Sequence, residues 1–90
     1  MSMSSPGDLL RFPCRFPIKA MGRADADVEA VVVEIIGRHA PGLDAAAVRV
    51  RASTGGKWLS VTVTIEAQSR SQLDAIYREL SAHESLVCVL

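Results

Sequence analysis

The segment from residue 46 to residue 67, AAVRVRASTGGKWLSVTVTIEA, leaves the fewest options for how this chain folds. Apolar and polar residues alternate on both sides of Gly55-Gly56, which is typical of a β-hairpin with a two-residue loop. With Thr54 paired to Lys57, three apolar pairs share one face of the hairpin: Val48 with Val63, Val50 with Val61, and Ala52 with Leu59. A slip of one residue would set valines against arginines and serines, so we predict this register.

Two amphipathic segments flank the hairpin and predict helices. Residues 25–40 carry apolar side chains at helical spacing, with Asp25 as the N-cap and a Pro-Gly stop after the last turn. Residues 69–82 show the same periodicity, and Ser69 and Gln72 have the spacing of a capping box. The side chains expected to form the two stripes are Val28, Val31, Val32, Ile35, Ile36, His39, Leu73, Ile76, Tyr77 and Leu80.

Two further strands are predicted near the ends of the chain, within residues 11–22 and at residues 86–90. The order β-α-β-β-α-β with right-handed crossovers gives an α+β two-layer sandwich: a four-stranded antiparallel sheet in the order 4-1-3-2, with both helices on one face. The first strand is then interior, although it contains Pro13 and Pro17, which cannot donate to a strand ladder. We therefore expect regular pairing to begin at or just after Pro17.

The composition indicates one small globular domain, residues 11–90, after a disordered tail at residues 1–10. Lys plus Arg and Asp plus Glu both number 10, and this zero net charge argues against a general polyanion binder. Two cysteines are too few for a disulfide scaffold, and no apolar run approaches a membrane span. The first residues lack the features of a signal peptide, so we expect a cytoplasmic protein that binds no membrane.

The motifs FPCRFPIKAMG, RHAPG, STGGKWLSVTVTIEA, QLDAIYREL and VCVL, within residues 12–90, resemble the YbeD-like family of small bacterial proteins of uncharacterised function. They occur in the family's order and spacing, and Trp58 stands where the family has an aromatic residue, usually tyrosine. The resemblance implies a ferredoxin-like fold similar to ACT regulatory domains, which bind small effectors and often pair through their sheets. It supplies no catalytic residues.

Catalytic sites that occur on this fold are not found in the sequence. An acylphosphatase needs an asparagine, and this chain has none, although Arg23 is expected in the loop after the first strand. A copper chaperone needs Cys-x-x-Cys in that loop, which here reads MGRADAD. No triad or carboxylate pair is evident, and the histidines and cysteines lack the spacing of a zinc site. We therefore expect no enzyme activity, catalytic residue, metal or cofactor.

Three residues leave alternatives open. His39 should pack at the core edge near the C-terminus of its helix, where a charged imidazole favours the helix dipole, and a functional role is the alternative. Cys14 and Cys88 lie on neighbouring antiparallel strands and are expected to be reduced thiols. The alternative is that the start of one strand meets the end of the other and brings the two thiols close together.

The sheet face without helices is the first candidate interaction surface. It should carry Lys19, Met21, Arg49, Arg51, Trp58, Ser60, Thr62, Thr64 and Glu66, and we expect the guanidinium of Arg51 on the Trp58 indole. The candidate contact residues are Arg49, Arg51, Trp58 and Thr62; the alternative is a solvated face. RNA-recognition sheets stack bases on two or three aromatic residues, and this face has only Trp58. A nucleic-acid-binding adaptor is therefore only the alternative function.

The end of the first strand is the second candidate site. Gly22 and Arg23 precede the first helix, where backbone N–H groups and the helix dipole favour an anion, and Lys19 completes the expected ligand site. The alternative is a turn glycine beside a surface arginine. We expect a non-catalytic regulatory or accessory domain that binds a small anionic effector, a partner enzyme, or both. The uncharged edge at residues 86–90 predicts a weak homodimer.

Overall fold

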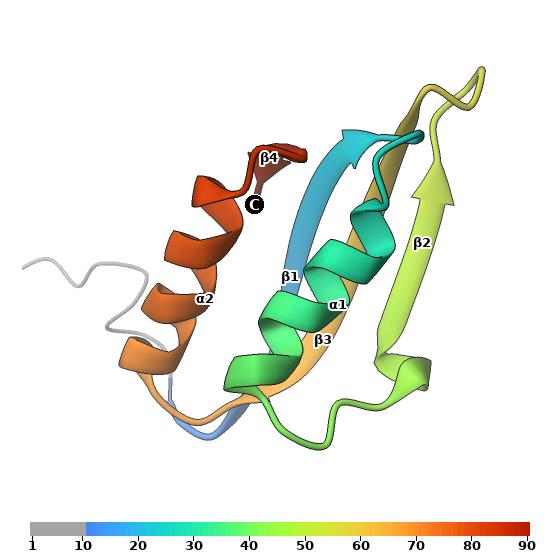
Figure 1. The fold of residues 1–90 in the computed structure, drawn as a ribbon. Helices are drawn as coiled ribbons and strands as arrows, with labels where there is room; N and C mark the ends of the chain where they lie inside the picture. Colours follow the sequence, from blue (N-terminus) through green and yellow to red (C-terminus); the bar gives the residue numbers. More distant parts are fainter. Residues whose placement is uncertain (1–10) are drawn as a thin grey trace, which may run out of the picture.

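A computed structural model describes residues 11–90, and the expected tail at residues 1–10 lies outside this range. The sheet has the order β2-β3-β1-β4 with antiparallel pairing throughout, and both helices cover one of its faces (Figure 1). This arrangement confirms the predicted βαββαβ fold. Its elements are β1 (Cys14–Arg23), α1 (Val28–His39), the short 3-10 helix η2 (Ala45–Ala47), β2 (Val48–Ala52), β3 (Trp58–Ala67), α2 (Arg70–Ala82) and β4 (Leu86–Val89).

The hairpin register is confirmed, but its loop is longer than predicted. Val48 pairs with Val63, Val50 with Val61 and Ala52 with Leu59. The Ser53 N–H donates to the Trp58 carbonyl at 2.9 Å, and the Gly56 N–H donates to the Ser53 carbonyl at 2.8 Å. The loop therefore consists of residues 54–57, and Gly55 and Gly56 supply its positive φ angles of 90° and 73°. The strand register is nevertheless the predicted one, because the longer loop removes only the expected pair of Thr54 with Lys57 at the strand ends.

The expectation that regular pairing begins at or after Pro17 is wrong. β1 pairs with β3 over its whole length, and Pro17 lies opposite Thr64. Lys19 exchanges two backbone hydrogen bonds with Leu90, at 3.1 and 2.7 Å, and there the pairing with β4 ends. Alternate residues of an antiparallel strand point their backbone groups to the same side, so Pro17 faces the β4 side beyond Leu90. Within residues 11–90 no strand pairs with β1 at that point, so the missing N–H removes no ladder hydrogen bond there.

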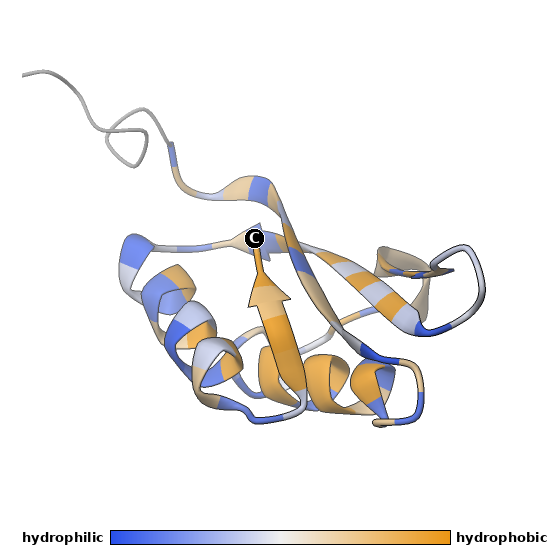
Figure 2. Cartoon of the chain, turned by 90° about the horizontal axis from the view of Figure 1, so that it is seen from above, coloured by the Kyte–Doolittle hydropathy of each residue, from blue (hydrophilic) through white to orange (hydrophobic). Residues whose placement is uncertain are grey.

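The core lies between the helices and one face of the sheet. In Figure 2, apolar and polar bands alternate along β3, whereas β4 is apolar along its whole length. The largest fully buried side chains come from both helices and the two central strands; they are Ile18, Val28, Val32, Ile36, Val61, Val63, Ile76 and Leu80. The two central strands therefore pack against both helices on this face, and their other side chains point to the opposite face of the sheet.

The helix N-termini differ in part from the predicted caps. α1 begins after Asp27, so the expected cap at Asp25 is wrong. α2 begins after Ser69, whose hydroxyl accepts the Gln72 N–H at 3.1 Å, as predicted. The Gln72 side chain, however, accepts from the Gln68 N–H rather than from Ser69, and it also donates to the His39 carbonyl at 2.7 Å. Gln72 thus joins the start of α2 to the end of α1.

The two cysteines lie at opposite ends of β1. Cys14 is opposite Ala67, whereas Cys88 is opposite Met21. Seven residues of β1 separate these two positions, about 23 Å at about 3.3 Å per residue. The alternative that brought the thiols close together is wrong because β4 is short and pairs only with the far end of β1.

Candidate binding face of the sheet

The sheet face opposite the helices, called the open face below, consists of side chains in rows across the strands. Register and hairpin hydrogen bonds define three rows: Lys19–Thr62–Arg49, Met21–Ser60–Arg51 and Arg23–Trp58–Ser53. Neighbouring strands lie about 4.8 Å apart, and successive rows about 6.8 Å apart. Side chains from three strands therefore meet on a surface that is wide enough for a ligand larger than a single small ion.

Lys19, Arg49 and Arg51, called the cationic group below, enclose two hydroxyls. All three cations are exposed, while Ser60 and Thr62 are half-buried between them. Among residues 11–90 no carboxylate forms an ion pair with the cationic group, whereas Arg23, Arg38 and Arg70 each pair with a carboxylate. Such cations and hydroxyls are donors suited to carboxylate or phosphate oxygens.

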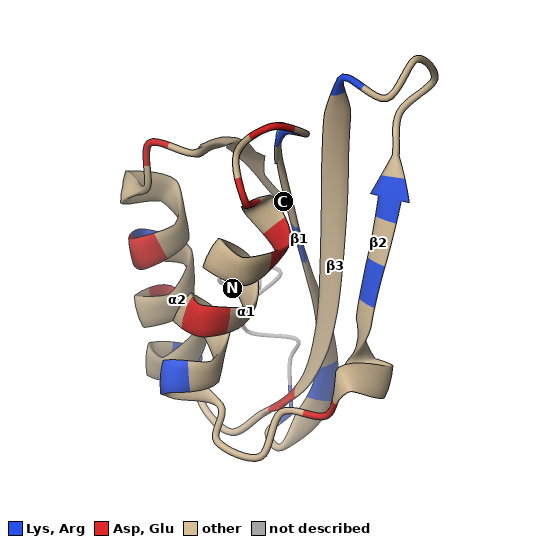
Figure 3. Cartoon of the chain, turned by 45° about the vertical axis from the view of Figure 1, so that its right-hand side comes forward, with Lys and Arg blue, Asp and Glu red and all other residues tan. Residues whose placement is uncertain are grey.

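The charges of the molecule are segregated. In Figure 3, β2 carries two basic bands and no acidic band, while most acidic residues lie on the helices and the connecting segments. The bands on β2 are Arg49 and Arg51. Glu66 lies opposite Arg15 at the far end of the sheet, about 13 Å along β3 from Thr62. The cationic group is therefore not neutralised from within its own face.

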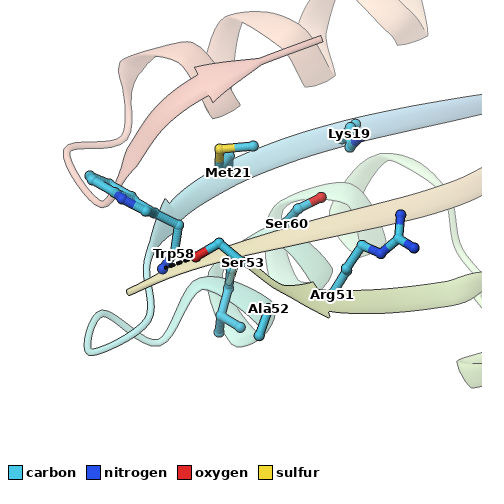
Figure 4. Close-up of a pocket in the computed structure, with 8 residues that line it drawn as sticks. Lys19, Met21, Arg51, Ala52, Ser53, Trp58 and Ser60 are labelled. Carbon is cyan, nitrogen blue, oxygen red and sulfur yellow. Dashed lines mark hydrogen bonds between the residues drawn. The ribbon is translucent and has the colours of Figure 1, made fainter. Parts of the chain in front are cut away.

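An apolar hollow, called the Trp58 hollow below, adjoins the cationic group. Figure 4 shows Met21 and Ser60 on neighbouring strands beside the half-buried Trp58. The Trp58 backbone N–H donates to the Ser53 hydroxyl at 3.1 Å, which closes the hairpin end of the hollow. Its lining residues are Lys19, Met21, Arg51, Ala52, Ser53, Trp58, Leu59 and Ser60. Lys19 and Arg51 of the cationic group, and Ser60 beside them, also line the hollow. The cationic group and the Trp58 hollow therefore form one continuous surface.

The cation beside Trp58 is Arg23, not Arg51. The Cζ of Arg23 lies 6.0 Å from the centre of the Trp58 ring, and its Nε lies 3.3 Å from the Asp25 carboxylate. Arg23 belongs to β1 and stands directly opposite Trp58, rather than in the loop where the sequence placed it. The expected stacking of Arg51 on Trp58 is therefore wrong, and Arg51, opposite Ser60, belongs to the cationic group.

Gly22 is buried and is required for packing. A Cβ at this position would collide with the carbonyl oxygen of Ser85 and would lie 2.8 Å from a methyl group of Val28. The loop before β4 and the first residue of α1 can therefore approach β1 only because residue 22 has no side chain. No space for a ligand is left above Gly22 itself.

The expected ligand residues Lys19, Gly22 and Arg23 do not converge on one site. Lys19 belongs to the open face, and Arg23 is paired with Asp25. Asp27 stands at the N-cap position of α1 without a side-chain capping hydrogen bond, and Glu29 lies in the first turn, so two carboxylates are already placed near the positive end of that helix. Of the candidate site residues, the structure instead groups Lys19 with Arg49, Arg51, Trp58 and Thr62.

The alternation along the strands predicts Met21 and Ser60 on this face, but it does not predict the hollow that they line. Their positions follow from the β1–β3 register, which sets Met21 opposite Ser60. The predicted hairpin register did indicate that Ser60 lies beside a cation of this face, because it sets Ser60 opposite Arg51. The hollow itself depends on how the Trp58 side chain lies, and alternation along a strand does not specify this.

His39 lies on the helix side of the molecule, away from the open face. Its Nε2 is 2.9 Å from the Glu79 carboxylate, which also accepts from Arg38 at 3.0 Å. The hydrogen bond with His39 is the main cause that lowers the pKa of Glu79, and the charge of Arg38 acts in the same direction. The predicted position at the core edge is confirmed, while its partner Glu79 was missed because that residue belongs to the other helix.

Residues 11–90 contain neither a metal-ion cluster nor a membrane-spanning helix. No group of three His, Cys, Asp or Glu side chains in this range is arranged to hold a metal ion. Neither α1 nor α2, with 12 and 13 residues, is long and apolar enough to cross a membrane. His83 instead accepts the Ser85 N–H through Nδ1 at 3.1 Å, which orders the turn before β4.

The chain is similar to proteins from several bacteria. A UPF0250 protein of Paraburkholderia phymatum is 45% identical over 82 residues, 91% of this chain and 92% of the relative. A UPF0250 protein of Paraburkholderia phytofirmans is 42% identical over 89 residues, 98% of this chain and 100% of the relative. The solution structure of protein HP0495 from H. pylori matches with a TM-score of 0.73 and 16% identity, covering 99% of this chain and 98% of that one.

These relatives agree with the fold and with the resemblance drawn from the sequence motifs. The match to HP0495 supports the ferredoxin-like fold, and its low identity limits the inference to the fold. The family described as "Protein of unknown function (DUF493)" matches residues 7–90. Neither this description nor the names of the relatives state a catalytic activity. The chain therefore belongs to the DUF493 family of uncharacterised bacterial proteins, the YbeD-like family that its motifs resemble.

Proposed function

We propose that this protein is a non-catalytic accessory or regulatory domain that binds an acidic segment of a partner protein, such as an enzyme, through its open face. The single observation that carries the proposal is the cationic group, which encloses two hydroxyls and has no ion-pair partner among residues 11–90. The Trp58 hollow borders this group, so an apolar side chain of the partner fits beside its carboxylates. The proposed location is the cytoplasm, where both thiols stay reduced.

The size of the surface favours a protein segment over a small effector. Lys19 and Arg49 stand on strands two apart, about 10 Å, and the Trp58 hollow extends the surface by another row. A single carboxylate or phosphate cannot contact all three cations and the hollow at once. A peptide with several carboxylates and one apolar side chain can do so.

The aromatic content of the face disfavours a nucleic-acid adaptor. Single-stranded nucleic acid is held by stacking of successive bases on aromatic side chains. Trp58 is the one aromatic residue of the open face among the described strands, and the Arg23 guanidinium already lies over its ring. With a net charge of zero, the chain also lacks the broad basic footprint of such proteins.

Titration of the isotope-labelled protein with a short peptide tests the proposal by nuclear magnetic resonance. The peptide has one leucine between two pairs of glutamates. We expect the amide signals of Lys19, Arg51 and Ser60 to shift, and Arg51→Gln to weaken binding several-fold, up to about tenfold. Arg78→Gln, an equal loss of charge on the exposed side of α2, is the matched control and should leave affinity unchanged.

Three outcomes would overturn the proposal. Signal shifts confined to the helices, or equal weakening by both substitutions, would show that binding does not use the open face. Inorganic phosphate that binds the cationic group as tightly as the peptide would point to a small anionic effector instead. A pyrimidine oligonucleotide that binds more tightly than the peptide, with strong salt dependence, would point to a nucleic-acid adaptor.

A further inference from the structure

The free edge of β4 is the most apolar exposed part of the described chain. Three large hydrophobic residues among 11–90 are strongly exposed, and two of them, Val87 at 60% and Leu90 at 64%, lie at this edge. β4 carries no charged side chain and is apolar throughout (Figure 2). α2 lies close by, with the Tyr77 hydroxyl donating to the Leu90 carbonyl at 3.0 Å, but it leaves Val87 exposed. An uncharged open edge of this kind is a template for strand pairing.

The other open edges of the sheet are less suited to self-association. The part of β1 beyond Leu90 contains Pro17, which has no N–H to offer an added strand. Antiparallel pairing of β2 with a second β2 about Val50 would set Arg49 opposite Arg51 of the other copy. Like charges directly opposite each other destabilise such a pair. Among the strands of residues 11–90, only β4 presents an open backbone without such repulsion.

We infer that two copies of this chain join through β4 in antiparallel register, with Cys88 at the two-fold axis. The segment that lies along β1 is residues 86–90, and Cys88 is its middle residue. The backbone N–H and C=O groups of Leu90 point to Lys19 of β1. Because backbone direction alternates along a strand, those of Cys88 also point to β1, whereas those of Val89 point to the free edge. A two-fold axis at Cys88 pairs all five residues of this segment with the other copy. Val89, whose backbone groups point to the free edge, then lies opposite Val87 of the other copy.

This register brings the two Cys88 side chains together. Cys88 is exposed and lies opposite Met21, so its side chain belongs to the open face. With its backbone turned inward, Cys88 forms a non-hydrogen-bonded pair with its counterpart, and Cα atoms in such pairs are about 4.5 Å apart. Disulfides require a Cα separation of about 4.4–6.8 Å. In a reducing cytoplasm both thiols stay reduced, and hydrogen bonds and apolar contacts hold the dimer.

The dimer also gives the open face a symmetric form, a consequence that rests on the proposed function. The two sheets join into one sheet of eight strands, and both open faces lie on the same side. The two β2 strands are then seven strand spacings apart, about 34 Å. An acidic partner with two equivalent segments at this separation would bind more tightly than one with a single segment.

Oxidative cross-linking of the purified protein tests the dimer. Oxidised glutathione is reduced to two glutathione molecules while the two thiols lose two hydrogens and form a disulfide. We expect Cys14→Ser, which retains Cys88, to form a linked dimer at least about tenfold faster when folded than in urea. Cys88→Ser, which retains only Cys14, should form no disulfide-linked dimer. Sedimentation at rising concentration under reducing conditions should show a weak dimer that Val87→Lys disrupts.

Several results would overturn the inference. One is a monomer up to about 1 mM together with cross-linking no faster than in urea. Another is Val89→Cys in the Cys88→Ser protein cross-linking faster than Cys88, which would move the axis to residue 89. A dimer that survives Val87→Lys but is lost on Trp58→Ala would place the interface on the open face. Arg51→Gln should leave cross-linking unchanged, so failure of the dimer and failure of peptide binding are distinguishable.

Discussion

Replacing Gly22 by alanine tests the packing between β1, α1 and the loop before β4. The added Cβ would collide with the Ser85 carbonyl oxygen and would lie 2.8 Å from the Cγ2 atom of Val28. The obstruction is backbone on one side and the first residue of α1 on the other, so neither can give way cheaply. Overpacking of this kind costs about 1–3 kcal/mol of the free energy of unfolding. The φ angle of Gly22 is not positive, so backbone strain adds nothing.

The same substitution at Gly37 is the matched control and should have the opposite sign. Gly37 lies inside α1, and a Cβ there would meet nothing within 4 Å. Alanine in a helix interior is more stable than glycine by about 0.5–1 kcal/mol. The free energies of unfolding of the two variants should therefore differ by about 1.5–4 kcal/mol in urea denaturation. For a domain of this size, 1 kcal/mol corresponds to about 4–8 °C in Tm.

Equal stability of the Gly22→Ala and Gly37→Ala proteins would refute this account of Gly22. It would mean that the loop before β4 does not approach β1 as closely as described. A Gly22→Ala protein of unchanged stability that had lost binding of inorganic phosphate would instead restore Gly22 as a ligand residue. The combined measurement therefore separates a packing role from a binding role at this position.

Three other perturbations address the core, the helix pair and the hairpin. Val61→Asp buries an unpaired charge beneath the helices and should lower the free energy of unfolding by more than about 3 kcal/mol. Thr62→Asp on the open face should lower it by less than about 1 kcal/mol. Similar midpoints of the two variants in urea denaturation would contradict the face assignment. Because the pKa of Glu79 is lowered on folding, its stabilising effect is present above the unfolded value of 4.5 and is lost as the pH falls. The difference in Tm between the natural protein and Glu79→Gln should shrink between about pH 5 and about pH 3, and an unchanged difference would exclude the pairing with His39. Gly56→Ala places a side chain at a φ of 73° and should destabilise the hairpin by about 1 kcal/mol, while a neutral effect would contradict the loop geometry.

The sequence predicted what depends on alternation along a strand. The pairing of Val48 with Val63 follows from period-two patterning, because a slip of one residue would turn arginines toward the core. The same patterning placed Arg49, Arg51 and Thr62 together on the face without helices. Lateral neighbours within the hairpin could therefore be assigned from residue types alone.

The sequence did not predict where the strands end, and the errors made about the sheet follow from this. Pro17 is tolerated in β1, and Cys14 is remote from Cys88, because β4 pairs only with the last part of β1. Arg23 reaches Trp58 because β1 continues one residue past Gly22. Strand ends depend on how far neighbouring elements extend and pack, and hydropathy at single positions does not encode these lengths.

The charge distribution of the open face is the strongest reason to regard it as a binding surface rather than as a solvated one. Arg49 and Arg51 lie on the same face of one strand, two positions apart, so their like charges repel each other. A glutamate at Thr62 would relieve this repulsion, and the chain has equal numbers of acidic and basic residues to distribute. The carboxylates instead lie mostly on the helices and loops (Figure 3). The repulsion between Arg49 and Arg51 does not stabilise the fold. It is offset when the carboxylates of an acidic partner bind between these arginines, which is the role proposed for this face.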